Sequence, residues 1–188
     1  MTVSYNKYYL TENLFGHAFP ELIDFFANYP TKGKVLDIGC GQGRDAIPIV
    51  RLGYEVVGVD YSKVGIEQML IIAESENLNL KGKVESMYAY KDFEGFDFVL
   101  FNSMFHFLKK DLDKETGLIK TTIEHIKSDG IIIFSIQDTG KKVKILNETI
   151  DYNGKLERLT DIDIKYIFED QESGHKSSTD YRMIIIKK

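Results

Sequence analysis

Cysteine is almost absent from the sequence, since Cys40 is the one thiol among 188 residues. A single cysteine excludes an internal disulfide and is typical of proteins of the reducing cytoplasm, where we expect this protein to be found. Long apolar runs are absent too, because none reaches the ~18–20 residues that a membrane-spanning helix needs. Residues 1–10 are polar and aromatic. We therefore expect neither a secretory signal nor a membrane partner.

A basic cluster is also missing. Lys and Arg number 24 against 29 Asp and Glu, which gives a formal charge of −5 at pH 7. The Lys187-Lys188 pair at the end of the sequence is too short to form a basic patch. Long-range attraction to a phosphate backbone is therefore not expected, and we predict no nucleic-acid partner.

Repeats, low-complexity tracts and linkers are likewise absent, and 188 residues fit one domain of ordinary size. Apolar residues make up 43% and charged residues 28%, which is typical of a globular protein. We predict a single domain over residues 1–188, with an N-terminal segment (1–30) and a Rossmann-like core (31–188). We expect a monomer or a homodimer, and no metal site.

Short apolar runs alternate with helical patterns along the core, which is typical of a parallel sheet covered by helices. The predicted strands cover residues 34–38, 54–59, 83–87, 96–101, 131–136, 162–169 and 181–187. The last two strands flank the polar segment 170–180 and are predicted to form an antiparallel hairpin. Helices are predicted over residues 44–52, after Ser62 as N-cap, before Asp129-Gly130, and over 142–150. Pro48 predicts a kink or a late start in the first of these helices, because proline lacks the amide that the helix needs.

The N-terminal segment combines aromatic side chains with a helical pattern. Its aromatic residues are Tyr5, Tyr8, Tyr9, Phe15 and Phe19. Apolar residues between 14 and 26 keep a helical spacing, and Pro20 is expected to open the second part of that segment. Two interpretations stay open: the segment packs on the core as a helix, or it covers a bound ligand and excludes water.

The most informative segment is the glycine-rich loop Gly39-Cys40-Gly41-Gln42-Gly43, which follows the predicted strand 34–38 and precedes a helix. Glycine adopts positive φ angles and lets a ligand approach the backbone. The start of a helix adds unpaired N–H groups and a partial positive charge, which suit an anion. The loop therefore predicts a site for either a dinucleotide pyrophosphate or the carboxylate of an amino acid.

Two residues beside the loop favour the amino acid. A dinucleotide site needs a third glycine at position 44, where this sequence has the bulky Arg44. Asp37 precedes the loop, and its carboxylate repels a pyrophosphate but attracts an ammonium or a sulfonium group. S-adenosylmethionine carries both of these cations and a carboxylate, so it fits this loop better than NAD does. An NAD-dependent oxidoreductase is the alternative.

A second acidic residue, Asp60, follows the predicted strand 54–59. An acidic residue about 20 positions beyond such a loop, at the carboxyl end of a strand, is placed to accept hydrogen bonds from both ribose hydroxyls. An aspartate at this position is also a common cap for the following helix. The register of the loop, Asp37 and Asp60 favours the ribose interpretation.

At these residues the sequence resembles the class I methyltransferases, over about residues 34–136 and more loosely to the end. Residues 37–43 are similar to the first motif of that family, Asp60 to the second, 96–103 to the fourth, and 128–136 to the stretch around the fifth strand. The resemblance implies an α/β fold, a Rossmann-like three-layer sandwich. Its seven-stranded, mostly parallel sheet would have the order 3-2-1-4-5-7-6, with strand 7 antiparallel. The resemblance also implies S-adenosyl-L-methionine as the cofactor.

The cofactor-binding residues that this resemblance implies follow the first four strands: Asp37, Gly39, Cys40, Gly41, Gly43, Arg44, Asp60, Tyr61, Ser86, Met87 and Asn102. The family often has an acidic residue after the third strand, which contacts the adenine amino group. Ser86 stands near that place here, so adenine is expected to contact the backbone of Met87 and its packing neighbours. Cys40 is not expected to act as a nucleophile, because no basic partner is near it in the sequence.

A narrower resemblance is to the tellurite-resistance (TehB-like) methyltransferases, often grouped with the thiopurine methyltransferases. It rests on short segments at residues 8–11 (Tyr-Tyr-Leu-Thr), 41–45 (Gly-Gln-Gly-Arg-Asp), 154–156 (Gly-Lys-Leu) and 172–175 (Glu-Ser-Gly-His). In such enzymes the N-terminal segment covers the bound cofactor, and a late His/Arg pair is implicated at the acceptor side. His175 matches that histidine, whereas Lys176 stands in place of the arginine.

The methyl acceptor is expected to be a small molecule. Enzymes that methylate nucleic-acid amines use an Asp/Asn-Pro-Pro-aromatic motif after the fourth strand, whereas residues 102–105 here are Asn-Ser-Met-Phe. A soft nucleophile such as tellurite, selenite or a thiol can attack a methyl sulfonium without a general base. Candidate polar groups at the acceptor side are Tyr8, His17, His106 and His175, with His106 equally suited to cap a helix. A non-catalytic module that binds the cofactor stays open as well.

Overall fold

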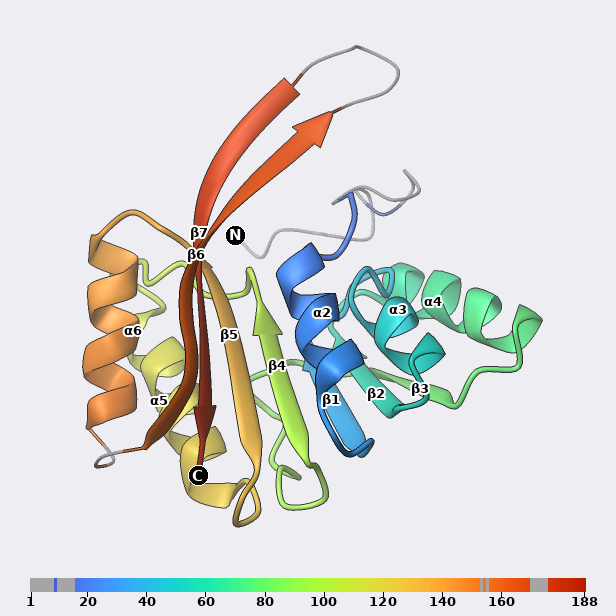
Figure 1. Ribbon diagram of the computed structural model, residues 1–188, viewed down its shortest axis with the longest axis horizontal. Helices are drawn as coiled ribbons and strands as arrows, with labels where there is room; N and C mark the ends of the chain where they lie inside the picture. Colours follow the sequence, from blue (N-terminus) through green and yellow to red (C-terminus); the bar gives the residue numbers. More distant parts are fainter. Residues whose placement is uncertain (1–8, 10–15, 153, 155, 170–175) are drawn as a thin grey trace.

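The computed structural model describes residues 9, 16–152, 154, 156–169 and 176–188. Its centre is a seven-stranded sheet of order β3-β2-β1-β4-β5-β7-β6 (Figure 1). The strands are β1 (Lys34–Ile38), β2 (Glu55–Asp60), β3 (Leu80–Val84), β4 (Phe98–Asn102), β5 (Ile131–Gln137), β6 (Glu157–Glu169) and β7 (Lys176–Lys187). Strands β1 to β5 are parallel, and β7 runs antiparallel to β5 and to β6. The predicted fold class, strand order and antiparallel final hairpin are confirmed.

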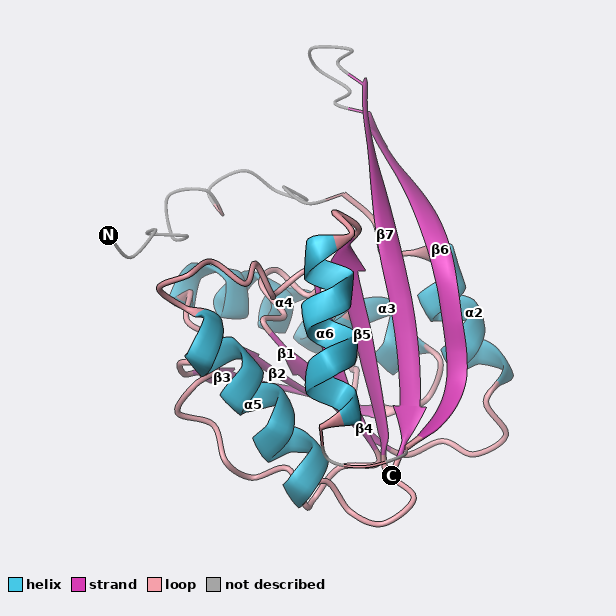
Figure 2. Ribbon diagram, turned by 90° about the vertical axis from the view of Figure 1, so that its left-hand side faces the viewer, coloured by secondary structure: helices cyan, strands magenta, loops and turns pink. Residues whose placement is uncertain are grey.

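Helices cover both faces of the sheet and give the three layers (Figures 1 and 2). They are α2 (Pro20–Asn28), α3 (Ala46–Arg51), α4 (Lys63–Ser75), α5 (Leu112–His125) and α6 (Lys141–Asp151). The first three pack on one face and the last two on the other, so each face has its own apolar cluster. Strand β5 contributes to both clusters and is buried at six successive positions, as expected for a strand that is apolar almost throughout.

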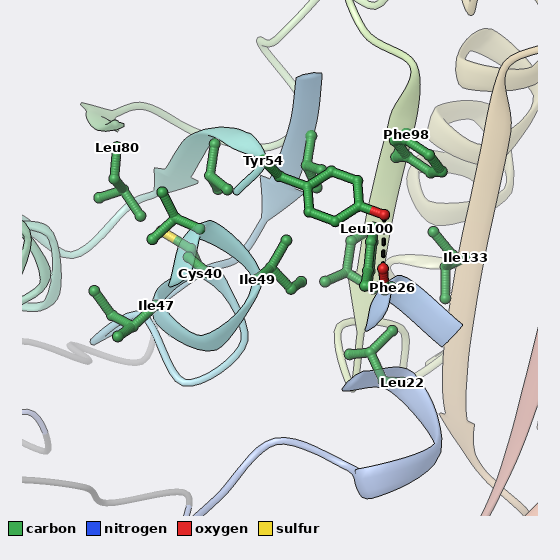
Figure 3. Packing of buried hydrophobic residues seen from close by; sticks show 14 of the residues in the cluster. Leu22, Phe26, Cys40, Ile47, Ile49, Tyr54, Leu80, Phe98, Leu100 and Ile133 are labelled. Carbon is green, nitrogen blue, oxygen red and sulfur yellow. Dashed lines mark hydrogen bonds between the residues drawn. The ribbon is translucent and has the colours of Figure 1, made fainter. Parts of the chain in front are cut away.

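Helix α2 belongs to the core. Leu22 and Phe26 are fully buried against the sheet. The Tyr54 hydroxyl, at the entrance to β2, donates a 2.8 Å hydrogen bond to the Phe26 carbonyl (Figure 3). Pro20 opens the helix, as predicted, because its missing N–H lies where the helix has no partner for it. The second part of the N-terminal segment, from Pro20 onward, is therefore a packing helix.

Two further helix signals in the sequence are confirmed. The Ser62 hydroxyl accepts a hydrogen bond from the Gly65 amide and caps α4. Helix α3 starts at Ala46, two residues later than predicted, so Pro48 falls in its first turn. A proline is tolerated there because first-turn amides have no intrahelical acceptor.

Several strand boundaries differ from the prediction. Strand β3 spans Leu80–Val84, not residues 83–87, because it forms by pairing with β2 in spite of a polar, mostly exposed sequence. Strand β4 begins at Phe98 instead of residue 96. Both hairpin strands start five residues earlier than predicted, at Glu157 and at Lys176. Pairing within the hairpin, and not apolar alternation, carries these polar residues into a strand.

The β6–β7 hairpin extends past the rest of the sheet. Only residues 181–187 of β7 pair with β5, whereas residues 176–180 pair with β6 alone. The hairpin therefore projects as an arm beyond the carboxyl end of β5 (Figure 2).

Within the described part of the chain, no helix has the length and apolar character needed to cross a membrane.

Candidate cofactor-binding site

The glycine-rich loop joins β1 to α3 at the carboxyl edge of the sheet. Gly39, Gly41 and Gly43 have φ angles of 78°, 53° and 84°. These left-handed conformations are favourable for glycine and costly for other residues. The amides of Gly39 and Cys40 donate to the Val59 carbonyl at 2.7 and 3.2 Å, which fixes the loop to the end of β2.

Close packing also requires the glycines. A Cβ atom on Gly41 would lie 2.5 Å from the Tyr9 hydroxyl, and one on Gly43 would lie 2.6 Å from Met69 Cγ. A Cβ atom on Gly39 would overlap the thioether sulfur of Met104. The loop is therefore held between the end of β2, helix α4 and two side chains that come from distant parts of the chain.

Asp60 anchors the loop and starts the next helix. Its Oδ2 accepts a 2.9 Å hydrogen bond from the Gly41 amide, and its Oδ1 accepts a 2.7 Å bond from the Ser62 amide. Burial raises the pKa of this carboxyl, and the two backbone donors oppose that shift. A carboxylate has about four acceptor positions, so these two bonds leave capacity for further donors such as hydroxyls.

Asp37 lies beneath the loop, fully buried on β1. Its Oδ2 has no hydrogen-bond partner among the described residues. Burial, reinforced by the nearby Asp45 carboxylate, holds the pKa of Asp37 well above its ordinary value. A buried acceptor without a partner is costly, and a cation that approached it would relieve that cost.

Arg44 and Asn102, two predicted site residues from different elements, meet at a third residue that the sequence analysis did not single out. The Arg44 guanidinium and the Asn102 amide both donate to Asp45 Oδ2, at 2.9 and 3.0 Å. The guanidinium also lies 5.5 Å from the centre of the Phe19 ring. Asp45 therefore ties the end of the loop to β4. The sequence analysis had included Asp45 in the segment 41–45, one of the segments behind the TehB-like resemblance, but had given it no role.

The other predicted cofactor residues lie close to the ends of β1, β2 and β3. Cys40 is buried in the loop, and burial raises the pKa of its thiol, which makes the nucleophilic thiolate less available. Tyr61 follows Asp60 with 68% of its surface exposed. Ser86 and Met87 follow β3 and are half-buried. The Glu85 amide donates to the Asp60 carbonyl at 2.9 Å, which connects this stretch to the end of β2.

The loop after β4 carries His106 and is held by a residue that sequence reasoning missed. Glu115 of α5, only 2% exposed, accepts from the amides of His106 and Phe107 at 3.2 and 2.5 Å. Ser103 and Phe107 in this loop have positive φ angles of 62° and 50°, so the backbone is strained. The His106 side chain is exposed, and α5 begins six residues later, so His106 does not cap it.

The remaining acceptor-side candidates are His17, Tyr8 and His175. His17 is exposed, and its amide donates to the Tyr166 hydroxyl at 3.1 Å. Tyr8 and His175 lie outside the described residues. Tyr9, next to Tyr8 in the sequence, packs on the glycine-rich loop; the sequence analysis named it only as part of the aromatic N-terminal segment and of residues 8–11.

A seven-stranded sheet of this order, with a glycine-rich loop after β1 and an acidic residue ending β2, defines the class I methyltransferase fold. Solved structures show the same fold. TehB from Haemophilus influenzae superposes with a TM-score of 0.73 at 21% identity, over 98% of this chain and 65% of that chain. A magnesium protoporphyrin IX methyltransferase from Synechocystis, solved with bound SAM, gives a TM-score of 0.62 at 14% identity, over 89% and 76%.

The sequence identifies the family within this class. Residues 2–165 match the family model described as tellurite resistance protein TehB, and the chain belongs to that family. It is 34% identical over 97 residues to a probable S-adenosyl-L-methionine-dependent methyltransferase TehB of Haemophilus influenzae. The aligned region covers 52% of this chain and 33% of that protein. It is 36% identical over 102 residues to a ubiquinone biosynthesis O-methyltransferase of Pelagibacter ubique, covering 54% and 41%. The matched regions thus make up less than half the length of each of these two relatives.

Proposed function

We propose that this protein is an S-adenosylmethionine-dependent methyltransferase that acts on a small-molecule acceptor. The observation that carries the proposal is the convergence of Asp37, the glycine-rich loop and Asp60 at the carboxyl ends of β1 and β2. Membership of the TehB family and the methyltransferase names of the relatives support the same activity. When bound, the cofactor supplies an activated methyl group on a sulfonium.

The residues of the site fit the two ends of such a cofactor. The glycine-rich loop, whose positive φ angles let a ligand approach the backbone, suits the amino-acid end, and the unpartnered Asp37 oxygen suits the positive charge there. The spare acceptor capacity of Asp60 suits the ribose hydroxyls. Tyr61, Ser86 and Met87 are assigned to the adenosine end, with Cys40, Arg44 and Asn102 closing the loop side.

The protein's part in methyl transfer is then mainly positioning, because in-line displacement at a sulfonium needs alignment more than proton transfer. We assign a soft acceptor: tellurite, selenite or a thiol. His17 and His106 are exposed, and neither ring forms a hydrogen bond with another described residue, whereas a general base has to be held in place. A soft nucleophile needs no such base. Tyr8 and His175 keep their proposed place at the acceptor side.

The acceptor is tested by incubating the pure protein with methyl-labelled donor and, separately, tellurite, selenite, thiols, catechols, small amines and RNA. We expect label transfer to members of the first three groups. Transfer confined to catechols, amines or RNA would refute the assignment of a soft acceptor while leaving the methyltransferase activity standing. The protein with Asp60→Ala serves as the control for labelling that does not depend on the site.

A further inference from the structure

Tyr9 lies directly on the glycine-rich loop. Only 5% of its surface is exposed. Its hydroxyl would touch a Cβ atom placed on Gly41, and its ring would lie 3.2 Å from a Cβ atom placed on Gly65 of α4. The phenol therefore fits into a space that exists only because both of these residues are glycine.

The backbone carbonyl of Tyr9 is held by two glutamine side chains. Gln68 Nε2 donates to it at 2.8 Å, and Gln42 Nε2 donates to it at 3.3 Å. Gln42 Nε2 also donates to Gln68 Oε1 at 2.8 Å. The bond between the two glutamines orients the Gln68 amide, because it occupies Gln68 Oε1 and leaves Gln68 Nε2 facing the Tyr9 carbonyl.

These contacts connect three parts of the protein that are distant in sequence. Gln42 stands between Gly41 and Gly43 within the loop, and Gln68 lies on α4, which flanks the loop. The Tyr9 carbonyl is the point at which both amides meet. The loop and α4 are therefore both joined to Tyr9 by side-chain hydrogen bonds.

We propose that Gln68 and Gln42 are positioning residues that dock Tyr9 over the glycine-rich loop and so close the amino-acid end of the cofactor site. The inference rests on the proposed cofactor site. Neither glutamine needs to touch the cofactor, because both act through the Tyr9 carbonyl. The buried phenol of Tyr9 lies against Gly41 and keeps water from this part of the loop.

The donor nitrogen of Gln68 is tested with two variants of similar size. Gln68→Glu places an acceptor against the Tyr9 carbonyl, and Gln68→Met removes the donor without adding charge. Calorimetry with S-adenosylhomocysteine should give a dissociation constant raised about 10-fold or more in the first and about 5-fold in the second. Gln137→Glu adds the same charge at an exposed glutamine whose oxygen already accepts from Lys142, and it should bind normally.

A double-mutant cycle with Tyr9→Ala separates positioning from a general effect on structure. If Gln68 acts through Tyr9, Gln68→Met should weaken binding in the natural sequence but add less than about 2-fold once the phenol is removed. Equal weakening in both backgrounds, or normal binding by Gln68→Met or Tyr9→Ala alone, would overturn the inference. Asp60→Ala distinguishes the two proposals. If it weakens binding while the Gln68 variants bind normally, only the docking role fails; if it binds normally as well, the cofactor site fails.

Discussion

Gly65, in the first turn of α4, offers a direct test of the glycine-rich loop as the cofactor cradle. A Cβ atom at this position would lie 2.8 Å from the Gly41 carbonyl oxygen and 2.9 Å from its carbon. Both are backbone atoms, which cannot rotate away as a side chain can. Gly65→Ala should therefore displace the loop while leaving the helix itself intact.

The magnitude follows from these contacts. Ordinary van der Waals contact begins near 3.4 Å, so the loop must move by about 0.6 Å. Overpacking of this kind costs roughly 1–3 kcal/mol, and replacing glycine by alanine in a helix returns roughly 1 kcal/mol. We expect a net loss of about 0–2 kcal/mol in the free energy of unfolding. The displacement disturbs the Gly41–Asp60 hydrogen bond, so the dissociation constant for S-adenosylhomocysteine should rise at least ~10-fold.

Gly117 provides the matched control. It lies within α5, where an added Cβ atom would meet nothing within 4 Å. Gly117→Ala should stabilise the protein by roughly 1 kcal/mol, or about 2–4 °C in melting temperature, with unchanged cofactor affinity. Calorimetry and thermal unfolding are measured on both variants. Normal cofactor binding by Gly65→Ala would show that the loop does not hold the cofactor.

Three further predictions concern charge, backbone and the acceptor-side loop. Because burial raises the pKa of Asp37 in the folded state, the charge of Asp37 lowers stability at neutral pH. Asp37→Asn should therefore raise the melting temperature at pH 7, and the two proteins should melt alike below the unfolded-state pKa of about 4. Equal melting temperatures at pH 7 would contradict this. The same substitution should weaken cofactor binding. Gly41→Ala should weaken cofactor binding far more than Gly53→Ala, since both have positive φ but only the first meets Tyr9, and calorimetry on the pair decides. Glu115→Ala should cost about 2–4 kcal/mol in denaturant unfolding, because one buried and one part-buried amide lose their acceptor, and a cost below ~0.5 kcal/mol would disprove its role.

The parts of the fold that could be predicted are those whose pattern is local. Strand β5 is apolar at almost every position, and Ser62 stands where a helix cap belongs. Strand β3 has no such pattern: its residues are mostly polar and exposed, and only pairing with β2 makes them a strand. The first residues of β6 and of β7 were missed for the same reason, because they are mostly polar and form strands by pairing with the other strand of the hairpin.

The site divides in the same way. Asp37, the loop glycines and Asp60 lie at or just after the ends of two consecutive strands, so their places in the site could be predicted from their positions in the sequence. Glu115 could not be found, because its partners are backbone amides eight and nine residues earlier, which leave no trace in sequence. Gln42 and Gln68 are 26 positions apart and uncharged, and their common acceptor is the carbonyl of Tyr9. Contacts of this kind depend on tertiary packing alone.

The central claim is that the loop and Asp60 bind S-adenosylmethionine. The most direct measurement is calorimetry of the pure protein and of Asp60→Ala with S-adenosylmethionine, S-adenosylhomocysteine and NAD. We expect the first two ligands to bind, NAD not to bind, and the folded variant to bind at least ~10-fold more weakly, because it loses charge-assisted hydrogen bonds to the ribose. Binding of NAD alone, or an unchanged dissociation constant in folded Asp60→Ala, would contradict the account.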